Sequence, residues 1–208
     1  MKTMVLLYDT SCIYEIVILN YFLNATGKEM IFVSPEGNPV MATEGYRIEA
    51  EDRLDHVNPG DVELLIIPGG DITQIDTPEV WEYLKNVHDS NGRIAAICAG
   101  VDVLEHAGLL EDAESIHSCE KDVVTSHRIT TSRANGYVDF AIEVAKQMEL
   151  FEDEADLQET IAFWREFQRV EGLFPPVQDS HAGDHPGSRK SPVVTPARLQ
   201  IFRRFAPA

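Results

Sequence analysis

The sequence predicts an α/β fold in which a mostly parallel sheet carries helices on both faces. Two observations support this prediction. Short apolar runs alternate with amphipathic segments from the first residues onward, and turns that contain glycine or proline separate them. Such alternation is typical of parallel sheets, whose strands are apolar throughout because helices cover both of their sides. A chain of 208 residues is long enough for one such domain with a full core.

In the first part of the chain, the apolar run Met4–Tyr8 is the first predicted strand. Ile13–Leu23 is predicted to be a helix, because its apolar residues recur at helical spacing. Met30–Ser34 is the second predicted strand. Val40–Ala50 is predicted to be an extended hairpin that turns around Gly45.

The middle of the chain repeats the strand–helix order. Glu63–Ile67 is a strongly apolar strand, and the turn Pro68-Gly69-Gly70 ends it. A helix is predicted from Pro78 to about Ser90, because the fixed φ angle of proline suits the first turn of a helix. Arg93–Ile97 is the next predicted strand, and the helix Val101–Leu110 follows it.

The last predicted elements of the sheet are the short strands Val123–Val124 and Arg128–Ser132 and the amphipathic helix Tyr137–Met148. The domain is predicted to extend over residues 1–172 and to include an added helix at about residues 156–170. Residues 173–208 are rich in proline, glycine and serine, which predicts a disordered tail.

Charge and cysteine content narrow the possible partners. The formal net charge is −18, and such a surface repels nucleic acid and anionic membranes. No run of about 20 apolar residues occurs, so no membrane span is expected. The three cysteines, an odd and sparse set, indicate a reducing cytoplasm rather than a disulfide framework. They form no Cys-x-x-Cys pair, and no metal site is expected.

The most informative segment is Ala96-Ile97-Cys98-Ala99-Gly100, between a predicted buried strand and a predicted helix. A cysteine at such a junction lies on a sharp turn over a helix N-terminus, where unpaired N–H groups and the helix dipole favour a thiolate. The small residues after it allow a tight turn and the approach of a substrate. This pattern is typical of a nucleophile elbow, with cysteine in the place of serine.

Six motifs carry a resemblance to a known family. In chain order they are Leu7-Tyr8-Asp9 with Glu15, Leu65-Ile66-Ile67-Pro68-Gly69-Gly70, Ala95-Ala96-Ile97-Cys98-Ala99-Gly100, Ala107-Gly108-Leu109-Leu110, Thr130-Thr131-Ser132-Arg133 and Val138-Asp139-Phe140-Ala141. With these motifs the chain resembles the DJ-1/PfpI (ThiJ) superfamily over about residues 3–150. The resemblance implies a flavodoxin-like three-layer sandwich of the class I glutamine amidotransferase-like type, and a homodimer.

The resemblance also implies a set of catalytic residues. Cys98 is expected to be the nucleophile, with Glu15 beside its sulfur. A carboxyl next to a thiolate is expected to have a raised pKa, so that it can donate a hydrogen bond to the sulfur or transfer a proton. His117 is the candidate base, and His127 is a weaker competitor.

Further roles are expected around this cysteine. The backbone N–H groups of Gly70 and Ala99 are expected to form an oxyanion hole. Cys12 and Cys119 are expected to be ordinary half-buried thiols, although a disulfide or redox relay between Cys12 and Cys98 stays open.

Two classes of function fit these residues. The first is a cofactor-free, cysteine-dependent enzyme that acts on a small electrophilic molecule, as a glyoxalase III-like enzyme or a related hydrolase or lyase. The second is a redox or stress sensor in which Cys98 is oxidised without turnover. Isonitrile hydratase-like, amidase-like and peptidase-like activities are further alternatives. A peptidase is disfavoured, because Ala99 stands where protease-like relatives have histidine.

Overall fold

The computed structural model describes residues 1–168, so the predicted disordered tail over residues 173–208 lies outside the described residues. The chain divides into two compact units. The first is Met1–Leu150 and contains the sheet. The second begins at Phe151 and contains the helix α5 (Glu154–Trp164).

The first unit is built on a seven-stranded sheet with the strand order β5-β2-β1-β6-β7-β9-β8. Its strands are β1 (Lys2–Leu6), β2 (Met30–Ser34), β5 (Asp52–Arg53), β6 (Val62–Ile67), β7 (Arg93–Ile97), β8 (Val123–Ser126) and β9 (Ile129–Ser132). Neighbouring strands are parallel except for β8 and β9, which are antiparallel. The prediction of a mostly parallel sheet is therefore confirmed.

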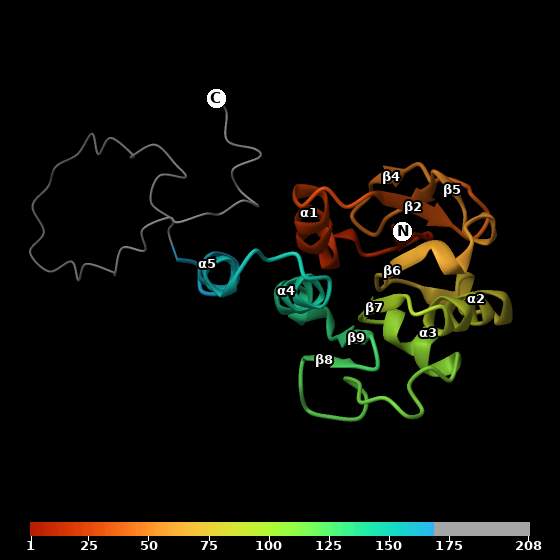
Figure 1. Ribbon diagram of the computed structural model, residues 1–208. Coiled ribbons are helices and arrows are strands. Elements are labelled where there is room, and N and C mark those ends of the chain that lie inside the picture. Colours follow the sequence, from red (N-terminus) through yellow and green to blue (C-terminus); the bar gives the residue numbers. More distant parts are fainter. Residues whose placement is uncertain (169–208) are drawn as a thin grey trace, which may run out of the picture. The chain divides into compact units, whose positions relative to one another are not determined.

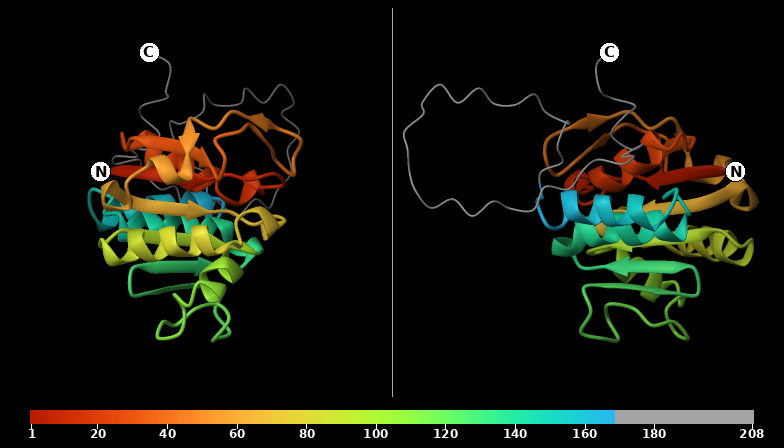
Figure 2. Two further views of the ribbon diagram at one scale, coloured as in Figure 1. Left: turned by 90° about the vertical axis from the view of Figure 1, so that its right-hand side faces the viewer. Right: turned by 60° about the vertical axis from the view of Figure 1, so that its left-hand side comes forward.

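Helices cover both faces of this sheet. On one face, α1 (Val17–Ala25) lies against α4 (Tyr137–Gln147), and on the other face α2 (Pro78–Asp89) and α3 (Gly100–His106) lie side by side (Figure 1). Figure 2 turns the α2–α3 side toward the viewer on the left and the α1–α4 side on the right. The expected three-layer arrangement is confirmed, and the predicted hairpin is present as β3 (Val40–Met41) paired with β4 (Arg47–Ile48).

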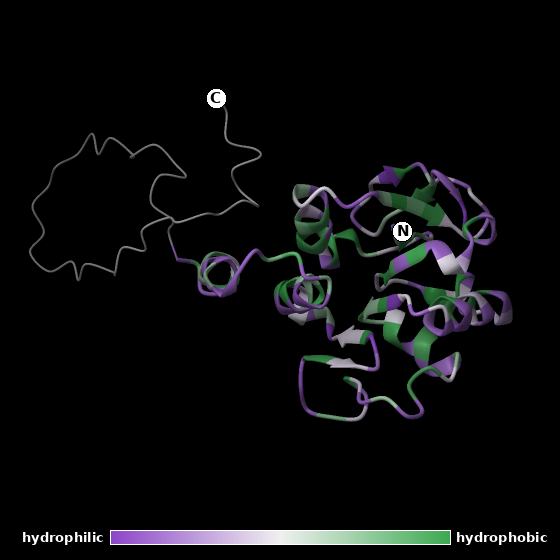
Figure 3. Cartoon of the chain, viewed as in Figure 1, coloured by the Kyte–Doolittle hydropathy of each residue, from purple (hydrophilic) through white to green (hydrophobic). Residues whose placement is uncertain are grey.

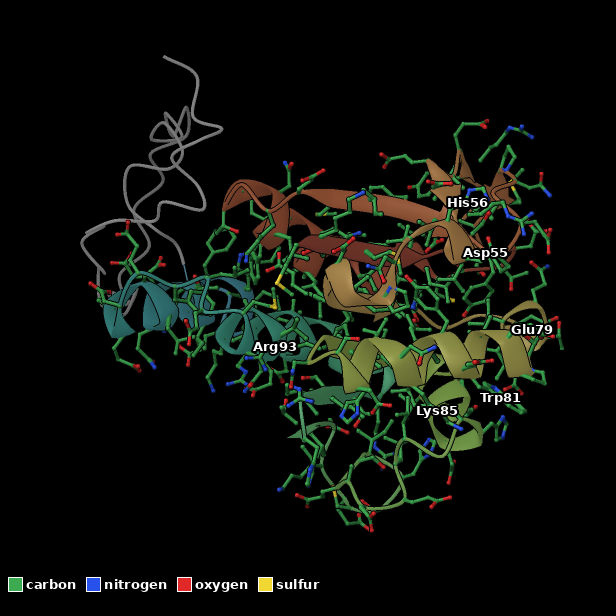
Figure 4. The ribbon with its side chains drawn as sticks, turned by 45° about the vertical axis from the view of Figure 1, so that its right-hand side comes forward. Asp55, His56, Glu79, Trp81, Lys85 and Arg93 are labelled. Carbon is green, nitrogen blue, oxygen red and sulfur yellow. The ribbon has the colours of Figure 1, made fainter. Side chains whose placement is uncertain are left out.

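The core lies between the sheet and its helices. The apolar character of the central strands in Figure 3 matches the burial of β6, in which Leu64 to Ile67 are all at most 1% exposed. Helix α2 is amphipathic, and Tyr83 and Leu84 on its inner side are buried. Glu79 and Lys85, labelled in Figure 4, lie on its exposed side. Each fully buried leucine or isoleucine stabilises the fold by roughly 1.5–3 kcal/mol.

Several boundaries differ from the predictions. The first predicted helix begins as a 3₁₀ turn, Ile13–Glu15, before α1 starts at Val17. Helix α3 ends at His106 rather than Leu110, because Gly108 adopts a φ of +75° and its N–H closes the helix onto the Glu105 carbonyl at 2.8 Å.

The helix of the second unit is also shifted along the chain. It starts at Glu154, because the Asp153 carboxylate caps it by accepting the Asp156 N–H at 2.9 Å. The two-residue edge strand β5 is too short to be recognised from its sequence. No helix within residues 1–168 has both the length and the apolar character needed to span a membrane.

Candidate active site

The candidate site lies at the carboxyl ends of the neighbouring strands β1, β6 and β7. Because these strands are parallel, the loops that follow them lie at the same end of the sheet. The loop after β1 leads into the 3₁₀ turn that carries Glu15, the loop after β6 contains Gly69 and Gly70, and Cys98 directly follows β7. Three segments that are far apart in the sequence therefore meet at one place.

Cys98 occupies a strained backbone turn, with a φ of +57°. Its N–H donates to the Ser132 carbonyl at 2.9 Å, and its carbonyl accepts the Val101 N–H at 3.1 Å. Gly100 allows this turn, because a Cβ atom there would lie 2.6 Å from the Ile67 carbonyl oxygen and 2.8 Å from that of Pro68. The cysteine is half-buried, so its thiol is shielded but reachable. The structure thus has the geometry of a nucleophile elbow.

Glu15 is a buried acid, only 1% exposed. Its Oε2 accepts the Gly69 N–H at 2.7 Å, and its Oε1 accepts the Tyr14 hydroxyl at 3.3 Å. A Cβ atom on Gly69 would lie 2.8 Å from Glu15 Oε2 and 2.9 Å from Cys98 Sγ. Both groups therefore lie close to Gly69, and there is room for them only because this residue has no side chain.

The pKa values of Glu15 and Cys98 are both raised. Burial is the largest cause that raises the pKa of Glu15, in the direction expected from the sequence, while hydrogen bonds from Gly69 N–H, Cys98 and Tyr14 oppose it. Burial, followed by the charge of Glu15, raises the pKa of Cys98 to about 11.

The raised pKa of Cys98 corrects one expectation. The helix N-terminus was expected to favour the thiolate, and the Ala99 N–H does act on the Cys98 sulfur in that direction. Burial and the neighbouring carboxylate outweigh it. A proton on Glu15 removes the second of these effects, which favours the Cys98 thiolate.

The candidate oxyanion donors adjoin the site in the chain, since Gly70 follows Gly69 and Ala99 follows Cys98. The Ala99 N–H interacts with the Cys98 sulfur. Gly70 has a φ of +144°, and a Cβ atom there would lie 2.5 Å from the Thr10 carbonyl oxygen, so only glycine fits this turn. Within the described part of the chain, no hydrogen bond uses the Gly70 N–H, which leaves this donor available to a ligand.

The two histidine candidates lie elsewhere. The imidazole of His117 is held between two carboxylates, with Nδ1 2.8 Å from Glu105 Oε2 and Nε2 3.3 Å from Asp102 Oδ1. No hydrogen bond or ion pair within residues 1–168 joins it to Cys98 or Glu15. His127 lies in the turn before β9, at the opposite edge of the sheet from Cys98.

Among the described residues, one group of side chains could bind a metal ion together: Asp102, Glu105 and His117. One ligand atom from each lies within 4.8 Å of the others, so together they could chelate a cation. The contacts of the two carboxylates with the imidazole nitrogens account for the same geometry, and two of the three residues are exposed.

Sequence reasoning missed two contributors to the site, Gly69 and Tyr14. The sequence could have indicated the role of Gly69, because a pair of glycines directly after a buried strand allows other groups to approach the backbone closely. Tyr14 had none beyond its adjacency to Glu15, because its contact with Tyr137, edge to face at 6.1 Å, joins distant segments. Cys12 and Cys119 are free, half-buried thiols, as expected.

The comparisons with known proteins agree with this geometry. The DJ-1/PfpI family model matches residues 1–147. The chain is 28% identical to the glutathione-independent glyoxalase DJR-1.2 of Caenorhabditis elegans over 151 residues, which is 65% of this chain and 81% of the relative. It is 26% identical to the deglycase PfpI of Pyrococcus furiosus over 100 residues, 47% of this chain and 60% of the relative.

Solved structures show the same fold. A DJ-1 superfamily protein from Agrobacterium tumefaciens has a TM-score of 0.71 at 24% identity, covering 81% of this chain and all of its own. The oxidised DJ-1 of Toxoplasma gondii has a TM-score of 0.67 at 23% identity, covering 78% of this chain and 96% of its own.

Proposed function

This chain belongs to the DJ-1/PfpI family, and we propose that it is a cofactor-free enzyme whose Cys98 attacks a small carbonyl compound of the α-oxoaldehyde class. The observation that carries the proposal is the contact of a half-buried thiol with a carboxyl that is 1% exposed. Relatives named as a glyoxalase and as deglycases support the same class of chemistry.

The reaction begins with one proton shared by two groups. When that proton lies on Glu15, Cys98 is a thiolate that accepts a hydrogen bond from the carboxyl. The sulfur attacks the aldehyde carbon, the C–S bond forms, and the carbonyl π electrons move to oxygen. Glu15 supplies its proton to that oxygen, which yields a neutral hemithioacetal.

The second half of the reaction regenerates the thiol. The Glu15 carboxylate takes the proton from the former aldehyde carbon, and the electron pair moves through the neighbouring carbon onto the ketone oxygen, which gives an enediolate. Glu15 returns its proton to that second carbon, and the proton of the first hydroxyl passes to the second oxygen, which produces a thioester of a 2-hydroxy acid. Water then attacks the thioester carbonyl, the C–S bond breaks, and the sulfur leaves with a proton. The sum is α-oxoaldehyde plus water to 2-hydroxy acid, with no external oxidant.

The backbone of the elbow supports these steps. The N–H groups of Gly70 and Ala99 are the proposed donors to the oxyanion of the attacked carbonyl. His117, whose imidazole contacts Asp102 and Glu105 of α3, takes no step in this proposal. Glu15 is the principal acid and base, because it contacts the sulfur.

The test is the conversion of methylglyoxal by Cys98→Ala, with Cys119→Ala as the matched control. Cys119 is also a free, half-buried cysteine, but its thiol donates to the Ser115 carbonyl, and no carboxyl of the described residues bonds to it. Loss of the nucleophile is expected to lower kcat/KM by about a thousandfold or more, because the covalent intermediate can no longer form at this position. The control is expected to keep the wild-type rate.

Two outcomes would contradict the proposal. A Cys98→Ala protein that converts methylglyoxal at the wild-type rate would exclude covalent catalysis by this thiol. If the wild type converts no α-oxoaldehyde, and dilute peroxide oxidises Cys98 to a sulfinic acid while sparing Cys12 and Cys119, the chain would instead act as a redox sensor.

A further inference from the structure

The buried Glu15 needs a route by which its proton can reach solvent. Within residues 1–168 its partners are the Gly69 N–H, the Tyr14 hydroxyl and the Cys98 thiol. A backbone amide does not release its proton in catalysis, and the thiol is the reacting group itself. The hydroxyl is the remaining partner, and it can both donate and accept a proton.

Tyr14 also has the exposure that Glu15 lacks. Its residue surface is 46% exposed, against 1% for Glu15. From this contrast we infer that Tyr14 is the positioning residue that orients the Glu15 carboxyl and relays its proton between the buried site and solvent. The inference rests on the proposed function, because that reaction releases one proton in each turnover when the 2-hydroxy acid leaves as its carboxylate.

The relay conserves atoms and charge. The O–H bond of protonated Glu15 breaks as its proton moves to the Tyr14 oxygen, and the original Tyr14 proton passes to water. Glu15 is left as a carboxylate, and Tyr14 stays a neutral phenol. Burial and the charge of Glu15 raise the pKa of Tyr14 to about 12, so the hydroxyl keeps its proton at neutral pH.

The surroundings hold the ring of Tyr14 in place for this task. Its backbone N–H donates to Glu44 Oε1 at 2.7 Å, and its ring meets Tyr137 edge to face at an interplanar angle of 81°. The hydroxyl lies 3.3 Å from Glu15 Oε1, longer than the usual range of about 2.5–3.0 Å. Hydrogen bonds of catalytic groups commonly tighten only when substrate is bound.

Other titratable groups near Glu15 do not provide the same route. The charge of Glu44 raises the pKa of Glu15, but no hydrogen bond joins these two carboxyls within the described chain. Cys12 lies on the other side of Gly69, where its N–H donates to the Gly69 carbonyl at 2.8 Å, and its thiol contacts Thr10 and Thr43. Among residues 1–168, Tyr14 alone combines a hydrogen bond to the Glu15 carboxyl with exposure.

The experiment compares Tyr14→Phe with Tyr46→Phe, which removes the hydroxyl of another exposed tyrosine. In Tyr14→Phe, kcat for methylglyoxal is expected to fall about tenfold while KM changes less than about twofold, because proton return becomes slow. Increasing concentrations of imidazole buffer are expected to restore part of kcat by carrying the proton. Tyr46→Phe is expected to match the wild type.

Alkylation of Cys98 by iodoacetamide gives a readout that requires no turnover. Loss of the Tyr14 hydrogen bond makes Glu15 hold its proton more firmly, which favours the thiolate. The alkylation rate of Tyr14→Phe at pH 7 is therefore expected to rise about two- to fivefold. A merely structural defect would lower both rates, whereas the relay predicts that they move in opposite directions.

The outcomes separate this inference from the proposed function. Wild-type kcat in Tyr14→Phe, or a loss of kcat that imidazole does not restore, would overturn the relay. If the wild type converts no methylglyoxal, the proposed function fails, and an unchanged alkylation rate would then also overturn the link from Tyr14 to Glu15. Incorporation of 3-fluorotyrosine at position 14 preserves the ring and lowers the pKa of the phenol, so the alkaline limit of kcat is expected to move to lower pH.

Discussion

Gly69→Ala is expected to abolish methylglyoxal conversion, with a fall in kcat/KM of at least about a hundredfold. The added Cβ atom would lie 2.7 Å from Cys98 Cβ and 2.8 Å from Glu15 Oε2. These distances are far below van der Waals contact, so the thiol and the carboxyl must move apart. Misplacing a reacting group by about 1 Å is enough to lower a rate a hundredfold.

The same substitution is expected to destabilise the protein. Overpacking in a buried region costs about 1–3 kcal/mol, which lowers Tm by several degrees in a chain of this size. Gly60→Ala is the matched control, since a Cβ atom there meets nothing closer than 3.7 Å. The measurements are kcat/KM and Tm for both variants. Wild-type kcat/KM in Gly69→Ala would show that close contact of Glu15 with Cys98 is unnecessary.

The sequence predicts the scaffold of this site better than its chemistry. The β6 and β7 strands and the turns after them are recognisable because they are short apolar runs followed by small residues. The elbow at Cys98 follows from that pattern. The two-residue strand β5 carries no such signal, since its pairing with β2 depends on the folded sheet.

Electrostatics at the site could not be predicted to the same extent. The pKa of Cys98 depends on competition between the Ala99 N–H, burial and the charge of Glu15, and only the structure shows that the last two dominate. The two carboxylates that contact His117 belong to Asp102 and Glu105 of α3. His117 lies in a later loop, so these contacts depend on how that loop packs against α3. Contacts that join separate segments are set by tertiary packing.

Glu15→Gln is expected to change the shape of the pH profile of Cys98 alkylation. In the wild type, the pair loses its first proton at lower pH and its last proton only at about 11, so the rate should rise in two steps. Between these steps, the form with the proton on Glu15 supplies thiolate. Glutamine removes both the shared proton and the negative charge, so a single step should remain.

The direction of each change follows from these charges. Near neutral pH the variant should react at least as fast as the wild type, because glutamine is neutral like protonated Glu15 and never carries the charge that keeps the proton on Cys98. Between pH 9 and 10 it should react faster, because the charge of Glu15 no longer raises the pKa of Cys98. Each unit by which that pKa falls increases the thiolate fraction about tenfold there. The two profiles are therefore expected to meet only at acid pH, where Glu15 of the wild type is neutral as well.

Turnover provides the second measurement on the same variant. Removing a general acid and base is expected to lower kcat by about a hundredfold to ten-thousandfold. Glu82→Gln, on the exposed side of α2, is the control for the loss of one surface carboxylate and should leave both the profile and kcat unchanged. Alkylation profiles of Glu15→Gln and wild type that superimpose would show that the two groups titrate independently. The chemistry would then have to begin from a thiol with a pKa of about 11, which is almost entirely protonated at neutral pH.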